Sequence, residues 1–369
     1  MNRRTFLRLG ALGVPVMAAQ STRAANGDDA HPLADVCVYG GTASGVMASV
    51  AAAREGCSVI IVEPSRWLGG MTGGGISHID WGRKEAVGGS TLGILQQDLD
   101  NAQYRATFRK MIEDNGIQVI YEHRLHSVLR DGAAIKSISL DYAPPNDIGC
   151  PPPEAIQVAS RSVSANVFID CSYEGDLMAA SGIPYTFGRE ATSQYDESLA
   201  GVRPALWTYD IDPYVKPGAP GSGLLPYVQD LNIGPLGSAD KLTMGYCFRF
   251  KFDLSGNGIP ITPTDSYDPA NFELWRRGFK QGIDLLRSRQ MRVLGEIDER
   301  DGQVLRDGTG NMNRSLLNTA VYGSNKDYPD GNWEARSAIW QMHQDFFRDL
   351  VHFLRTDPAV PAEQRERAS

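Results

Sequence analysis

The stretch from Asp35 to Gly75 decides the fold and reads DVCVYGGTASGVMASVAAAREGCSVIIVEPSRWLGGMTGGG. Its apolar start up to Tyr39 predicts a strand buried on both faces. The alanine-rich segment of about Ala43–Glu55 predicts a helix, and the next apolar run predicts a second strand that ends at Glu63. A strand, a glycine turn, a helix and a strand with a terminal acid form, in this order, the unit that holds a dinucleotide.

The glycine turn matches the dinucleotide fingerprint G-x-G-x-x-G except at its middle position, which is Thr42. The helix that follows would present its N-terminal N–H groups to a diphosphate. The residues expected at this contact are Gly40, Gly41, Thr42, Ala43, Ser44 and Gly45. Glu63 falls where an acid accepts hydrogen bonds from ribose hydroxyls, and its charge makes NADP the less favoured nucleotide. An ordinary βαβ unit with a glycine turn is the alternative interpretation.

A second glycine loop follows Glu63 and contains Leu68-Gly69-Gly70-Met71-Thr72. An acid followed shortly by Leu-Gly-Gly resembles the FAD-binding proteins of the glutathione-reductase type, in which this loop runs beside the diphosphate and toward the flavin. The resemblance implies FAD rather than NAD, although an NAD-dependent dehydrogenase stays an alternative. The cofactor contacts that it implies here are Pro64, Arg66, Gly69, Gly70, Met71 and Thr72.

Further motifs resemble a bacterial family of FAD-dependent oxidoreductases whose substrates are largely unassigned. They include Gly69–Gly75, Gly82–Gly89, Phe168–Ala180, Gly188-Arg189-Glu190, Leu199–Arg203 and Asp357–Pro361. In such proteins a later strand returns to the first sheet, which implies FAD contacts at Asp170 and Cys171. The residue near Leu125 is implied to lend backbone groups to the adenine.

The same resemblance implies an α/β protein with a Rossmann-like FAD/NAD(P)-binding domain of glutathione-reductase type over residues 33–191. A second, α+β substrate domain would occupy residues 192–369, where prolines and aromatic residues become frequent. Within it, strict alternation predicts a strand at Tyr246–Phe252, and helices are expected at Phe272–Arg289 and Trp333–Leu354. Members of the family continue with a segment that closes on the FAD, so we expect this chain to be truncated at its C-terminus. A non-catalytic flavin-binding remnant is therefore an alternative function.

The predicted catalytic residues are His78 and Asp80, which lie just past the loop that is expected to reach the flavin. A flavin supplies hydride chemistry, and a side chain usually moves the substrate proton. The alternative is that His78 only forms hydrogen bonds within its loop. The five cysteines show no metal-type spacing, so no metal site is expected.

The first residues resemble a twin-arginine export signal over residues 1–25, because Arg3 and Arg4 precede the apolar run Leu9–Ala19. That run is too short to span a bilayer stably. The net charge of −8 makes a nucleic-acid partner unlikely. The sequence thus predicts a periplasmic or secreted FAD-dependent oxidoreductase that meets the twin-arginine export machinery. It would transfer hydride between a small organic substrate and the flavin, with an unknown electron acceptor.

Overall fold

The structure is a computed structural model that describes residues 33–74, 82–97, 99–203, 210–229, 233–246, 248, 250–251, 259–282, 309–310 and 319–369. The predicted export signal and the predicted catalytic residues His78 and Asp80 lie outside the described residues.

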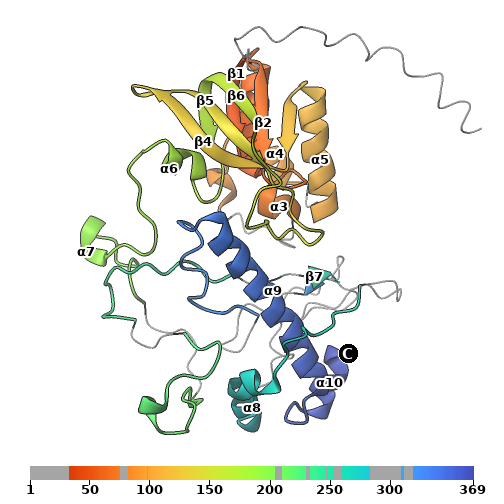
Figure 1. The fold of residues 1–369 in the computed structure, drawn as a ribbon, viewed down its shortest axis with the longest axis vertical. Coiled ribbons are helices and arrows are strands. Elements are labelled where there is room, and N and C mark those ends of the chain that lie inside the picture. The colour runs from red at the N-terminus through yellow and green to blue at the C-terminus, as the bar shows by residue number, and fades with distance from the viewer. Residues whose placement is uncertain are drawn as a thin grey trace, which may run out of the picture.

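A six-stranded sheet forms the upper part of the molecule (Figure 1). Its strand order is β3-β2-β1-β6-β5-β4. The strands are β1 (Leu33–Tyr39), β2 (Val59–Glu63), β3 (Gln118–Tyr121), β4 (His123–Asp131), β5 (Ala134–Tyr142) and β6 (Gln157–Asp170). The pairs β1–β2, β2–β3 and β1–β6 are parallel, whereas β4–β5 and β5–β6 are antiparallel. The predicted Rossmann-like α/β arrangement is therefore present.

The long strand β6 belongs to both halves of this sheet. Its first half pairs with β5, and its second half pairs with β1, so that Ser164 is opposite both Ser137 and Leu33. The apolar run Ser164–Asp170 predicts only the second half of this strand. The first half is rich in exposed polar residues, and it lacks the apolar signal of a strand buried on both faces.

Strand β1 is covered on both faces because its side chains alternate between two cores. Val36 and Val38 face α2 (Ala43–Arg54) and α5 (Asn101–Asp114), together with the buried Phe108. Cys37 and Tyr39 face the opposite core, which β5, β6 and α6 (Asp176–Ala180) complete. An apolar run without polar alternation is the pattern expected of a central parallel strand.

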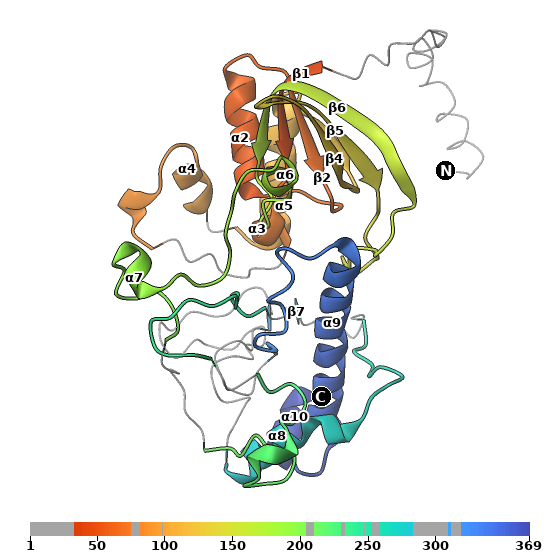
Figure 2. The same cartoon turned by 60° about the vertical axis from the view of Figure 1, so that its left-hand side comes forward.

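A second module lies below the six-stranded sheet and is built around the helix α9 (Trp333–Thr356), as Figure 2 shows. Its aromatic core includes Phe272, Phe346 and Phe353, each at most 1% exposed, together with Trp275 of α8 (Glu273–Lys280). The helix α10 (Ala362–Ala368) packs beside α9. The helix predicted from Trp333 is confirmed.

The remaining elements are short. They are α3 (Gly70–Gly74), α4 (Thr91–Leu95), α7 (Thr192–Tyr195), β7 (Phe250–Lys251), β8 (Thr309–Gly310) and the 3₁₀ turns Lys84–Ala86, Pro220–Ser222 and Pro269–Phe272. Within the described residues, no helix is long and apolar enough to cross a bilayer.

The strand predicted at Tyr246–Phe252 is shorter than expected, because within the described residues β7 covers only Phe250–Lys251. The alternating aromatic residues before it pack on α9 instead. Phe248 meets the ring of Trp340 with centroids 5.0 Å apart, and Tyr246 meets His343 at 5.3 Å. The alternation correctly indicates one apolar face, but that face packs on a helix.

Candidate functional site

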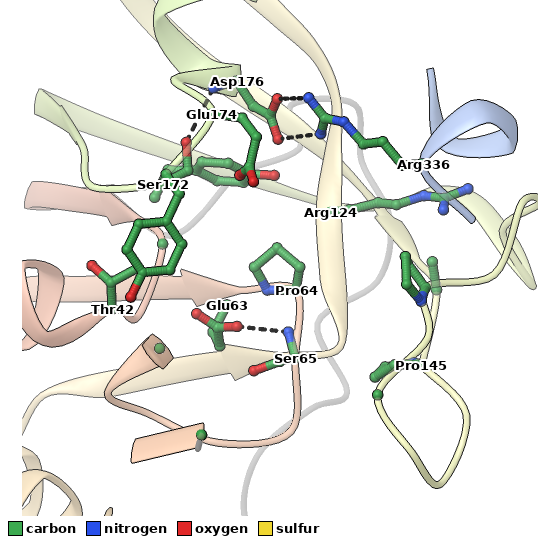
Figure 3. A pocket seen from close by; sticks show the side chains of 18 of the residues that line it. Thr42, Glu63, Pro64, Ser65, Arg124, Pro145, Ser172, Glu174, Asp176 and Arg336 are labelled. Atoms are coloured by element: carbon green, nitrogen blue, oxygen red, sulfur yellow. Dashed lines mark hydrogen bonds and ion pairs between the residues drawn. The ribbon is translucent and has the colours of Figure 1, made fainter. Parts of the chain in front are cut away.

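A cavity of about 340 Å³ opens where β1, β2 and β6 end (Figure 3). Gly40 follows β1, Glu63 closes β2, and Ser172 follows β6, and all three line the cavity. In open α/β sheets, ligands bind outside the carboxyl ends of the parallel strands. The second module supplies the opposite wall through Tyr328 and the first residues of α9. The volume falls within the range of roughly 300–1,000 Å³ that is usual for small-molecule sites.

The glycine turn after β1 depends on two positions that only glycine fits. Gly40 has φ of +97°, in the left-handed region, and a side chain there would also meet the backbone of Ser172 at 2.6 Å. At Gly45 a Cβ atom would lie 1.9 Å from the carbonyl oxygen of Gly40. These contacts bring the start of α2 close to the strand end, as a dinucleotide turn requires.

Thr42, the departure from the glycine fingerprint, has a structural reason. Its φ of −63° and ψ of 175° are ordinary extended values, so glycine is not needed there. Its side chain caps α2 by accepting the N–H of Gly45 at 3.2 Å, and it donates to the carbonyl oxygen of Cys171 at 2.8 Å. The hydroxyl therefore ties the helix to the loop after β6. The N-cap Thr42 lines the cavity, so the N-terminus of α2 lies at its edge, where a helix N-terminus favours an anion.

Glu63 is the predicted ribose-binding acid, and its carboxylate lines the cavity while only 8% of the residue is exposed. One oxygen accepts the N–H of Gly41 at 2.6 Å, and the other accepts the N–H of Ser65 at 2.7 Å. Burial raises the pKa of this carboxyl, and the two amide bonds oppose that effect. A carboxylate has about four lone-pair sites, so each oxygen can accept one further hydrogen bond from a ribose hydroxyl.

The second glycine loop is joined directly to the first. The N–H of Gly69 donates to the carbonyl oxygen of Gly41 at 2.8 Å, and the N–H of Met71 donates to the hydroxyl of Tyr173 at 2.8 Å. Arg66 points elsewhere, because its guanidinium pairs with Glu122 at 2.7 Å and does not line the cavity. No cation is among the residues of this loop that line the cavity, which are Pro64, Ser65, Trp67, Gly70, Met71 and Gly74.

The turn after β6 is organised by Asp170, which was predicted to contact the cofactor. Its carboxylate accepts the backbone N–H of Ser172 at 2.9 Å and that of Met178 at 2.8 Å. The N–H of Cys171 donates to the carbonyl oxygen of Tyr39 at 2.7 Å. Asp170 and Cys171 therefore shape the turn, and the residues that line the cavity are Ser172, Tyr173, Glu174 and Asp176.

Arg336 of α9 connects the two modules across the cavity wall. Its guanidinium donates to both carboxylate oxygens of Asp176, at 2.7 and 2.9 Å, and the two side chains are only 6% and 18% exposed (Figure 3). Burial by itself would lower the pKa of Arg336, but the bonds to Asp176 and the nearby charge of Glu174 raise it overall. The pair is a largely buried, bidentate ion pair.

Glu174 projects into the middle of the cavity (Figure 3). Burial raises the pKa of its carboxyl, Arg336 lowers it, and the neighbouring Asp176 raises it again. Among the described residues, no other side chain forms a hydrogen bond or ion pair with this carboxyl, and its own backbone N–H lowers its pKa slightly. It is therefore a titratable group that lines the cavity.

The predicted site residues divide into three sets. The cavity is lined by Gly40, Thr42, Glu63, Pro64, Gly70 and Met71. Packed around it without lining it are Gly41, Ala43, Ser44, Gly45, Arg66, Gly69, Thr72, Leu125, Asp170 and Cys171. The backbone N–H of Leu125, expected at the adenine, donates to the hydroxyl of Tyr39 at 3.1 Å. The third set, His78 and Asp80, lies outside the described residues.

Sequence reasoning missed the side chains that the second module and β4 contribute, namely Arg124, Tyr328, Trp333 and Arg336. Arg124 precedes Leu125, which the resemblance indicated, but the sequence does not show which face of the strand meets the cavity. Trp333 and Arg336 are at the start of a predicted helix, and their position depends on a contact between segments far apart in the chain.

The residues that line the cavity fit FAD. The N-terminus of α2 suits a diphosphate, and Glu63 has acceptor capacity left for ribose hydroxyls. The backbone around Gly70 and Met71 can approach a ring closely because it forms part of the cavity wall. When bound, FAD supplies hydride transfer, and the chain supplies position and charge.

Among solved structures, three examples are similar to part of the chain. The flavin-dependent brominase Bmp2 is 12% identical with a TM-score of 0.30, and the match covers 43% of this chain and 42% of the brominase chain. The T. acidophilum thioredoxin reductase is 18% identical with a TM-score of 0.25, and the match covers 37% of this chain and 34% of the reductase chain. The L-proline dehydrogenase from P. horikoshii is 15% identical with a TM-score of 0.26, and the match covers 38% of this chain and 23% of the dehydrogenase chain. The match spans less than half the length of each of these chains.

Comparison with curated proteins gives no significant match. A family model described as FAD dependent oxidoreductase matches residues 35–364, which is most of the chain. The protein therefore belongs to the family of FAD-dependent oxidoreductases, and this membership confirms the predicted family and enzyme class, the Rossmann-like α/β fold and FAD as the cofactor.

Proposed function

We propose that the protein is an exported FAD-dependent oxidoreductase that transfers hydride between a small organic substrate, such as an alcohol or a sugar-derived hydroxyl compound, and the flavin. The observation that supports this most is the meeting of Glu63 with the glycine turn before α2 on one cavity. An acid for ribose and a helix N-terminus for a diphosphate are the two protein groups that a dinucleotide needs.

In this proposal the residues of the chain bind, orient and move protons. Glu63 accepts hydrogen bonds from the ribose hydroxyls, and the first turn of α2 holds the diphosphate. His78 and Asp80 are the proposed groups that move the substrate proton. Glu174 is a described carboxyl in the same cavity, and its raised pKa suits a group that gains and loses a proton.

The first experiment is to purify the protein and record its visible spectrum. We expect the two absorbance bands of a bound flavin, either as purified or after FAD is added. A colourless protein that takes up no FAD would refute the proposal, and parallel titration with NAD tests the nicotinamide alternative. Anaerobic bleaching of the flavin by a panel of alcohols and sugars then identifies the substrate class. Retained FAD that no compound of the panel bleaches would favour a non-catalytic flavin-binding protein.

Export is a separate part of the proposal and rests on the residues before the described fold. The motif Arg3-Arg4 with its apolar run supports passage through the twin-arginine machinery. Replacing both arginines by lysine, as Arg3→Lys with Arg4→Lys, should retain the protein in the cytoplasmic fraction. Equal amounts of wild type and variant in the periplasm or medium would contradict twin-arginine export.

A further inference from the structure

Arg124 is a buried cation in the cavity wall. It is the second residue of β4, it lines the cavity, and it is only 4% exposed. Figure 3 shows it on the side of the cavity opposite Thr42, with Glu63 and Glu174 between the two. The cavity therefore has two ends, and the end away from the start of α2 carries an arginine.

The guanidinium of Arg124 is only partly satisfied by the protein. One terminal nitrogen donates to the carbonyl oxygen of Pro152 at 2.6 Å, and the other donates to that of Pro153 at 3.2 Å. These bonds use two of the five N–H donors that a guanidinium carries. The Nε–H is buried and has no acceptor among the described residues. A buried donor without an acceptor costs free energy, so the protein alone compensates this guanidinium incompletely.

Arg124 also lacks a counter-ion, unlike the other arginine of the cavity. Arg336 is paired with Asp176, but no carboxylate of the described chain lies within ion-pair distance of Arg124. Asp141 acts on it only at longer range, and that carboxylate is already engaged with His126 at 3.0 Å. Burial lowers the pKa of Arg124, which is the effect expected for a cation that water and carboxylates do not compensate.

The start of α9 strengthens the positive potential at this end. Trp333 is the first residue of this 24-residue helix, and its ring lies 4.7 Å from the guanidinium carbon of Arg124 and 5.0 Å from that of Arg336. The N-terminus of a helix carries a partial positive charge. The exposed Glu334 in the first turn offsets part of it.

We propose that the end of the cavity formed by Arg124, Trp333 and the start of α9 is a binding site for an anionic oxygen group, a phosphate or a carboxylate, of a ligand. The guanidinium of Arg124 donates to this group, which also acts as the missing counter-ion. Because the start of α2 is the proposed place of the FAD diphosphate, the group at this other end belongs to a separate acidic substrate. That assignment rests on the proposed function, whereas the site itself does not.

The test uses inorganic phosphate and the full-length protein, without and with FAD. Thermal unfolding is measured in phosphate and in chloride at equal ionic strength. We expect saturable protection by phosphate of the FAD-free wild type, and loss of that protection in Arg124→Gln. The matched control is Arg161→Gln, which removes the same charge from an exposed position of β6 and should keep the protection.

The arm with FAD identifies the source of the anion. If FAD abolishes the protection by phosphate and Arg124→Gln weakens FAD binding by about tenfold or more, FAD itself occupies this end, which would refute both a separate substrate and the placement of the diphosphate at the start of α2. If the protection persists with FAD bound, the occupant is a separate acidic substrate.

Two further outcomes keep the proposal open to refutation. Arg124→Lys keeps the cation but loses the planar guanidinium donors, so it should show weaker, saturable protection even if the glutamine variant does not fold. Equal stability of the wild type in phosphate and chloride, or equal protection of all variants, would overturn the anion site. Failure to bind FAD would refute the proposed function. The phosphate measurements on the FAD-free protein would still decide whether Arg124 forms an anion site.

Discussion

Removing Arg336 tests whether its ion pair with Asp176 joins the two modules. The guanidinium forms two hydrogen bonds to that carboxylate and two more, to the carbonyl oxygens of Tyr328 and Pro329, at 3.0 and 2.7 Å. Replacement by methionine keeps an unbranched apolar stem and removes every one of these donors. Asp176 is then left as a largely buried carboxylate without a partner.

Breaking a buried ion pair on one side costs about 3–5 kcal/mol. Asp176 keeps 18% of its side chain exposed, so water recovers part of its solvation. We therefore expect Arg336→Met to lower the free energy of unfolding by about 3 kcal/mol, the low end of that range. Asp176→Asn should also be destabilising, and the double variant should lose much less than the sum of the two single losses.

The assay is urea unfolding followed by tryptophan fluorescence, applied to all four members of the double-mutant cycle. Lys110→Met is the control, because it breaks the exposed pair with Asp114 and should leave the unfolding midpoint unchanged. Additive losses in the cycle would refute the ion pair as the connection between modules. A loss for Arg336→Met no larger than that of the control would refute it as well.

Three further predictions concern the cavity itself. Glu63→Gln should weaken FAD binding about tenfold or more in a flavin absorbance titration, because one carboxylate acceptor becomes a donor; unchanged affinity would refute the ribose role. Gly45→Ala should give little soluble flavoprotein, since its Cβ would lie 1.9 Å from the oxygen of Gly40, whereas Gly93→Ala, with nothing within 4 Å, should fold and load normally. The carboxyl of Glu174 has a pKa above its ordinary 4.5 in the folded protein. The protonated carboxyl therefore contributes fully to the free energy of unfolding below pH 4.5, and this contribution is lost as the pH rises through the pKa of the folded protein. In Glu174→Gln, the melting temperature should therefore fall less than in the wild type as the pH rises above 4.5. Parallel curves of melting temperature against pH for the two proteins would contradict the raised pKa.

The first half of the fold was predictable because its signals are local. The apolar run of β1, the alanine-rich helix α2 and the acid at the end of β2 follow one another within Leu33–Glu63, and each has its own pattern. The helix α5 was also predictable, because Tyr104, Phe108 and Ile112 recur at helical spacing and are buried.

The far wall of the cavity was not predictable in the same way. Arg336 meets Asp176 only because the second module folds back onto the loop after β6, and no local pattern encodes that contact. The role of Asp170 shows a related limit. A motif indicates that the residue is near the cofactor, but whether its carboxylate faces the ligand or bonds the turn depends on geometry.

The double pairing of β6 has a consequence for the order in which the protein folds. Its partner β5 ends at Tyr142, close in sequence to Gln157 where β6 begins, so the β4–β5–β6 meander can form early from local contacts. Its other partner, β1, is roughly 130 residues away, and closing so long a loop is slow. We therefore expect the meander to act as a template on which the amino-terminal strand docks late. The ends of β1 and β6 that border the cavity would then come together in one of the last steps of folding.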